Sequence, residues 1–306
     1  MCCFAGPVKS VTDTNLFARL SGNGTQLLAY QMKFETEKEN AMILPLPVAT
    51  PAREDSLQFI SLKEYDSLFD DMDRAFPVIK PPSRGYGVPL SAAASAIDSP
   101  LVVHDVGDFV ASFVPTMNDF GRLDPRFVIP KSSWDKIPQY ADYGFAVFQL
   151  KDLKGKPHPM AFEFETRMKN EIFFPTVHIH DGEVHRREHF DHTLYLQNAE
   201  FDKVVGKYVN HRVKDSATGF VRSKDIARRF CEVEKAAGLV DGNLLLHRIE
   251  MRGTMENKDV IAPVAAAHGK TPGFRFGHLL SITPALLGMC GLGWIINRRN
   301  RLRREG

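Results

Sequence analysis

Short strand-like segments that occur in local runs are the feature of this sequence that most constrains its fold. Thr14 to Leu20 and Thr25 to Phe34 have strand patterning, and the Asn23-Gly24 pair between them is typical of a tight hairpin turn. Ala41 to Val48 follows as a third strand, and its two prolines fit an edge better than a sheet centre. We expect these three segments to form a meander.

Further strand-like segments follow the same pattern. Phe190 to Gln197 alternates apolar and polar residues, as in a half-buried strand. The other expected strands are Leu101 to Val114, Phe145 to Leu150, Met160 to Phe164, Glu171 to His180, Asn243 to Arg252 and Asp259 to Pro263. Because the strands do not alternate regularly with helices, we predict an α+β fold with a predominantly antiparallel sheet.

Two main helices are expected beside this sheet. Ser61 and Glu64 have the spacing of a capping box, and the apolar residues from Leu62 to Met72 fall on one helical face. Ser223 is a candidate cap for the second helix, which Gly238 would end. The Pro-, Ser- and Gly-rich residues 77–100 between them are typical of a flexible loop.

The end of the chain has a different composition from the rest of its 306 residues. Residues 1–274 form the predicted single domain, residues 279–296 lack any charge, and the tail 297–306 is rich in arginine. An uncharged run closed by a basic cluster predicts a C-terminal hydrophobic helix that is membrane-associated, with residues 279–306 contacting lipid. The alternative is a helix docked on the domain. The side of the membrane on which the domain lies stays open.

Histidines are concentrated in one stretch: five of the eleven lie between His178 and His192. On a strand, His178 and His180 share a face, and His192 on a returning strand would complete a three-ligand site. Imidazole nitrogens suit a divalent transition metal such as zinc, whose fourth position would then stay open. The competing interpretation is a solvated loop without a metal.

Cys2 gives an alternative hypothesis of an N-terminal-nucleophile amidohydrolase. Removal of Met1 would place a thiol and an α-amino group on one residue, so that the amine acts as base for its own side chain. This start, followed by Phe17-Ala18-Arg19, is similar to the bile-salt-hydrolase branch of that class, which implies Arg19 as a catalytic neighbour. A third alternative is a non-catalytic structural or interaction domain, so enzymatic activity stays undecided.

The layout also resembles a group of uncharacterised bacterial proteins of unknown function over residues 2 to 200. The resemblance depends on the cysteine start, the strand pair, Ala41 to Val48, Val102 to Val114, Tyr140 to Leu150 and Phe173-Phe174-Pro175. It implies export and a C-terminal membrane helix, but no catalytic residue. The formal net charge of +2 gives no reason to expect a nucleic-acid partner, and protein partners are unknown.

Overall fold

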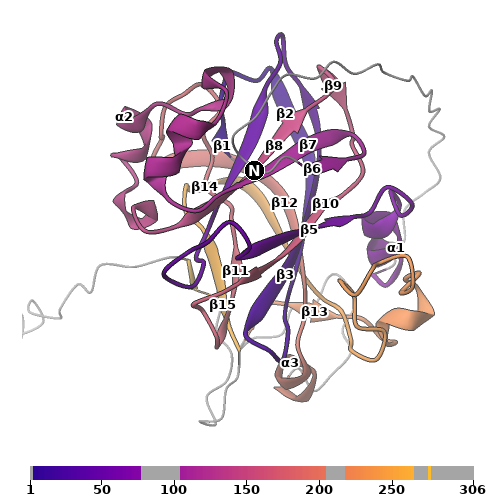
Figure 1. Ribbon diagram of the computed structural model, residues 1–306. Coiled ribbons are helices and arrows are strands. Elements are labelled where there is room, and N and C mark those ends of the chain that lie inside the picture. Colours follow the sequence, from indigo (N-terminus) through magenta and orange to yellow (C-terminus); the bar gives the residue numbers. More distant parts are fainter. Residues whose placement is uncertain (1–2, 77–103, 205–217, 265–274, 277–306) are drawn as a thin grey trace, which may run out of the picture.

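Two large β-sheets and one small sheet form the framework of the protein, shown in Figure 1. The computed structural model describes residues 3–76, 104–204, 218–264 and 275–276. The larger sheet has the strand order β13-β14-β12-β2-β3-β10-β5, with β9 paired to β3. Its strands are β2 (Ser10–Leu20), β3 (Thr25–Glu35), β5 (Leu57–Ser61), β9 (Lys154–Gly155), β10 (Met160–Glu165), β12 (Arg187–Gln197), β13 (Val221–Arg222) and β14 (His247–Glu256).

The second sheet has the strand order β1-β4-β8-β7-β6, and the small sheet has the order β11-β15-β16. Their strands are β1 (Cys3–Phe4), β4 (Ala41–Leu46), β6 (His104–Val106), β7 (Phe109–Val114), β8 (Gly144–Leu150), β11 (Glu171–Phe174), β15 (Val260–Pro263) and β16 (Arg275–Phe276). Among the described strands, β12 and β2 form the one parallel pair. Antiparallel pairing therefore predominates, and the prediction of a sheet-rich α+β fold is confirmed.

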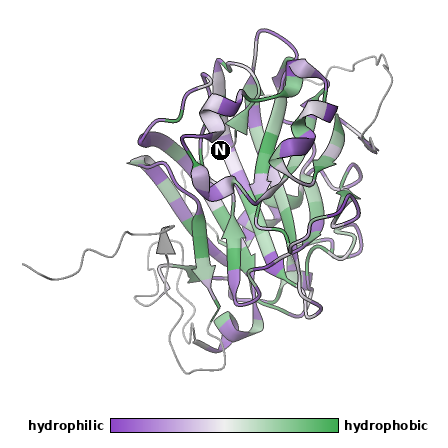
Figure 2. Ribbon diagram, turned by 60° about the vertical axis from the view of Figure 1, so that its left-hand side comes forward, coloured by the Kyte–Doolittle hydropathy of each residue, from purple (hydrophilic) through white to green (hydrophobic). Residues whose placement is uncertain are grey.

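Within the described residues, the helical segments are short and lie beside the sheets. They are α1 (Leu68–Arg74), α2 (Lys131–Trp134), α3 (Ala199–Val204) and the 3₁₀ turns η1 (Met117–Arg122), η2 (Pro125–Phe127), η3 (Pro138–Tyr140) and η4 (Ala227–Arg229). In Figure 1, α1 and α2 flank the strands on opposite sides. Figure 2 shows hydrophobic residues concentrated along the strands and hydrophilic residues in the connections.

The main core lies between the two large sheets. Leu16 and Leu28 from the larger sheet belong to the same buried cluster as Leu44 and Phe148 from the smaller one. Two further clusters cover the outer faces. One joins α1 and residues 227–246 to the larger sheet, and the other joins the helical connection between β7 and β8 to the smaller sheet. Both faces of each sheet therefore contribute to hydrophobic burial, which drives folding.

The two predicted helices are largely replaced by other structure. Ser61 ends strand β5, where it pairs with Met160, so it does not cap a helix at Glu64. The first helix begins only at Leu68. In the second region, the Ser223 hydroxyl donates to the carbonyl of Asp225 and accepts from the amide of Leu246. Within the described residues, one 3₁₀ turn and a series of turns take the place of that helix.

The predicted meander is also corrected. Strands β2 and β3 form the expected hairpin, with Gly24 at a φ of +88°. Strand β4, however, leaves that sheet and pairs with β8 and β1 in the smaller one. Pro45 pairs with Phe145 on one side, and β1 reaches only Ile43 on the other. The proline therefore lies beyond the end of the short outer strand.

Two predicted features lie outside the described residues: the loop 77–100, and the membrane segment 279–296 with its expected lipid contacts over 279–306. Within the described ranges, no helix has the length and apolar character needed to cross a bilayer. This finding contradicts the prediction of a membrane-associated protein with a transmembrane helix.

Phe148 gives a direct test of the packing between the two large sheets. Its buried ring lies 5.2 Å from the ring centroid of Phe109 in its own sheet, and 5.5 and 5.9 Å from those of Phe59 and Phe162 in the other. We expect Phe148→Ala to lower the free energy of unfolding by about 3–5 kcal/mol, because it leaves a cavity in the core. Urea unfolding monitored by circular dichroism measures this loss.

Leu153→Ala is the matched control, because Leu153 is 47% exposed. We expect this substitution to change the free energy of unfolding by less than about 0.5 kcal/mol. Equal effects of the two substitutions would contradict the assignment of the core.

Candidate functional site

Three of the histidines predicted from the sequence come together in the structure. His178 and His180 lie in the irregular segment that follows β11, and His192 lies on β12. The ring of His178 is stacked between the other two. Its centroid is 5.0 Å from that of His180 and 5.2 Å from that of His192, with interplanar angles of 23° and 18°. The expected chain reversal between these segments is therefore present.

Glu188 is the additional residue that the structure places at this site. One possible ligand atom from each of His178, His180 and Glu188 lies within 4.8 Å of the other two. Glu188 shares a face of β12 with Phe190 and His192, because side chains alternate along a strand. The period of two in the sequence could have identified it. His192 packs on His178 but lies outside this three-residue group.

Burial determines the protonation of these imidazoles. His178 and His192 have no exposed surface, and His180 is half-buried. Loss of solvent places the pKa of His178 far below its ordinary value and lowers the pKa of His180 to about 4. Both rings are therefore neutral near pH 7, which is the form that binds a metal ion.

Several ring nitrogens at the site lack hydrogen bonds. Among the described residues, His180 Nε2 and both ring nitrogens of His192 are buried without a hydrogen-bond partner. The carboxylate of Asp191 is close to His192, with Oδ1 3.8 Å from Nδ1. Buried polar atoms are normally paired, and each such exception requires an explanation. An ion or molecule bound at this cluster would supply the partner that His180 Nε2 lacks.

Side chains from the turn between β14 and β15 fix the backbone of the histidine segment. Asp259 Oδ1 accepts hydrogen bonds from the amides of Thr176 (2.8 Å) and Val177 (3.2 Å), and its Oδ2 accepts one from the hydroxyl of Tyr140. Asn257 Oδ1 accepts the next amide, that of His178, at 2.7 Å. Three successive amides thus bond to side chains instead of to a neighbouring strand.

The loop beyond His180 is exposed and separate from the cluster. The His185 ring is 2.9 Å from the carboxylate of Asp181, which raises the pKa of His185. Both side chains are solvated, so this pair matches the interpretation of a simple surface loop. The dense histidine stretch of the sequence therefore divides into a buried part and a solvated part.

The residues of the nucleophile hypothesis are not brought together within the described residues. Cys2 lies outside the described residues. Arg19 donates from Nε to the carbonyl of Leu239 at 3.1 Å and from Nη2 to that of Gly238 at 2.6 Å. Burial lowers the pKa of Arg19, with the carboxylates of Asp241 and Glu163 opposing the change. The guanidinium thus binds backbone carbonyls at the outer layer of the larger sheet.

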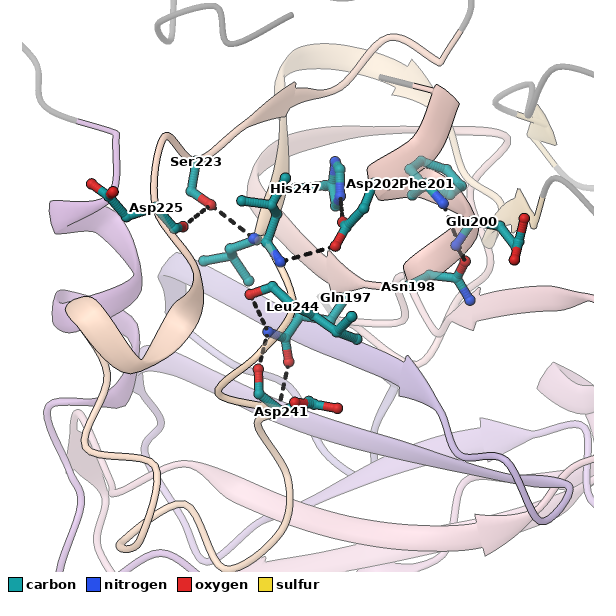
Figure 3. A network of polar contacts seen from close by, with 12 residues as sticks. Gln197, Asn198, Glu200, Phe201, Asp202, Ser223, Asp225, Asp241, Leu244 and His247 are labelled. Carbon is teal, nitrogen blue, oxygen red and sulfur yellow. Dashed lines mark hydrogen bonds and ion pairs between the residues drawn. The ribbon is translucent and has the colours of Figure 1, made fainter. Parts of the chain in front are cut away.

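Another buried histidine, His247, belongs to a different network, which Figure 3 shows. Its Nε2 is 2.7 Å from Oδ1 of Asp202, and Oδ2 of the same carboxylate accepts from the amide of Leu245 at 3.2 Å. Burial lowers the pKa of His247, and Asp202 opposes this effect. The hydroxyl of Ser223 bonds to backbone groups in this region. The network therefore attaches α3 to β14.

Comparisons with known proteins give no family assignment. No protein-family model matches the chain, and no curated protein matches it. The resemblance to an uncharacterised bacterial family thus stays a prediction.

Solved structures of baculovirus P35 are similar to the chain at 12–13% identity. A crystal structure of P35 matches with a TM-score of 0.42, covering 87% of this chain and 100% of that chain. A mutated P35 after caspase cleavage matches with a TM-score of 0.43, covering 83% of this chain and 99% of that chain. A caspase-8/P35 complex matches with a TM-score of 0.41, covering 83% of this chain and 97% of that chain. Similarity of this size transfers no function. The matched structures are all of this viral protein.

Asp259 generates a prediction on the pH dependence of stability. Burial raises its pKa from 3.8 to about 6, although three hydrogen bonds oppose this rise. Between these two values the folded state binds more protons than the unfolded state, so this residue's contribution to stability is lost as the pH rises. Asparagine cannot ionise. We therefore expect the free energy of unfolding of Asp259→Asn to rise by about 1–3 kcal/mol relative to that of the native chain as the pH increases from 4 to 7.

Urea unfolding of both chains at pH 4, 5.5 and 7 measures this difference. Because the comparison is between two chains at each pH, the titration of other groups cancels. A difference that stays constant, or that falls with rising pH, would contradict a protonated carboxyl at this position.

Proposed function

We propose that this domain binds one divalent transition metal ion, best matched by zinc, through His178, His180 and Glu188. The observation that carries the proposal is the convergence of three possible ligand atoms within 4.8 Å of one another. Ligand atoms of a tetrahedral zinc site are about 3.3–3.6 Å apart at normal bond lengths. The side chains would therefore approach one another by no more than about 1.5 Å on binding.

The donor set favours zinc over calcium or magnesium. Two imidazole nitrogens and one carboxylate oxygen suit zinc and neighbouring transition metals, whereas calcium and magnesium prefer oxygen ligands alone. The carboxylate of Glu188 would neutralise one of the two positive charges of the ion. Three protein ligands also leave a fourth position for water or another molecule.

His192 supports the proposed ligands without joining them. Its ring packs against that of His178 at 5.2 Å between centroids and restricts the orientation of that ligand. Phe190 contacts the same ring at 4.3 Å. These contacts leave the His178 ring with no exposed surface, which restricts its orientation towards a bound ion.

The role that follows is to join two parts of the chain. His178 and His180 belong to the irregular segment after β11, and Glu188 belongs to β12. An ion bound to all three would connect these segments across the loop 181–187. Since binding occurs only in the folded state, it would also stabilise the domain.

Metal analysis of the purified chain tests the proposal. After removal of metal with a chelator and addition of zinc, we expect one zinc ion per chain by elemental analysis. We expect His178→Ala and Glu188→Gln each to weaken zinc binding at least about 100-fold, because each removes one of three ligands. Glu188 is partly exposed, so its variant retains the fold even where the buried His178 variant does not.

His189→Ala is the matched control. His189 follows Glu188 on β12, so its side chain lies on the opposite face of the sheet, where it is exposed. Its partner on the neighbouring strand β14 is Thr254. We expect this variant to bind zinc as the native chain does. Absence of zinc from the native chain, or an equal loss in the His189 variant, would overturn the proposal.

A further inference from the structure

Asn257 connects the two ends of the loop that separates the proposed metal ligands. Its Oδ1 accepts a hydrogen bond from the amide of His178 at 2.7 Å, and its Nδ2 donates to the carbonyls of His178 (3.0 Å) and His185 (2.9 Å). Its own backbone amide donates to the carbonyl of Arg186 at 3.0 Å. One residue thus bonds to both ends of the segment 178–186.

These bonds fix the distance between the ligand-bearing segments. His178 is itself one proposed ligand, and Arg186 lies two residues before Glu188, another. Because these side-chain hydrogen bonds of Asn257 go to backbone groups, they set the position of the main chain from which the ligands project. A metal site requires ligand positions accurate to a fraction of an ångström.

We infer that Asn257 is a positioning residue of the metal site, which sets its affinity without contacting the ion. This inference rests on the proposed function. Groups around the ligands of metal sites commonly change affinity 10–100-fold when they are removed. Asn257 acts one step further away, through the backbone. Its side chain is partly exposed, so water can replace its bonds after truncation.

The test compares Co²⁺ and Zn²⁺ binding by Asn257→Ala with that of the native chain. We expect the variant to bind both ions about 10-fold more weakly. At saturating Co²⁺ we expect the visible absorption band to keep its native position, because the ligands themselves are unchanged. Asn257→Asp is a second variant, which keeps an acceptor for the His178 amide but loses both donated hydrogen bonds. We expect it to weaken binding as well.

Asn198→Ala is the matched control. Asn198 Oδ1 accepts the amides of Glu200 (2.8 Å) and Phe201 (3.2 Å) at the start of α3, so its removal also breaks side-chain bonds to the backbone. We expect this control to leave metal affinity within twofold of the native value. Thermal unfolding of the metal-free chains confirms that each variant is folded at the temperature of the titration.

The outcomes separate this inference from the function on which it rests. Failure of the native chain to bind metal overturns the proposed function. Native binding together with unchanged affinity in both Asn257 variants overturns the positioning role alone. A displaced Co²⁺ band in Asn257→Ala also overturns it, because the set of ligands would then have changed.

Discussion

The packing of two sheets around one shared core is the constraint on which the rest of the structure depends. Each large sheet is also covered on its outer face, so its strands carry apolar residues on both sides. A polar residue in the covered part of such a strand therefore lies in a buried environment. His192 does so on β12, as does the His178 ring that packs against it. The buried histidines of the candidate site are thus polar groups in a largely apolar environment.

The strands could be predicted from the sequence, because their patterning and turn residues are local signals. The β2–β3 hairpin and the strand of Phe190 to Gln197 follow from alternation and turns. His178 does contact His180 and His192, although the segment of His178 and His180 is irregular where a strand was expected. Sheet membership is not a local property. Nothing in residues 41–48 indicates that β4 pairs with β8 and not with β3, since that choice depends on partners about 100 residues later.

The helices were overpredicted for a related reason. A capping-box spacing at Ser61 and Glu64 describes a local preference of a few kcal/mol at most. In the fold, Ser61 instead completes a strand that pairs with β10. Ser223 likewise bonds to Leu246 and Asp225. Glu188 is one of many charged residues in the sequence, and only its period of two with Phe190 and His192 on β12 indicates that it faces the histidines.

The parallel pairing of β12 with β2 has a consequence for synthesis of the chain. Strand β2 ends at Leu20, but its partner β12 begins only at Arg187. Most of the polypeptide must therefore leave the ribosome before these two strands of the larger sheet can pair. Until then the edge of the β2–β3 hairpin remains without its partner and exposes apolar side chains. Binding of molecular chaperones to the nascent chain should therefore be concentrated in the interval before β12 emerges.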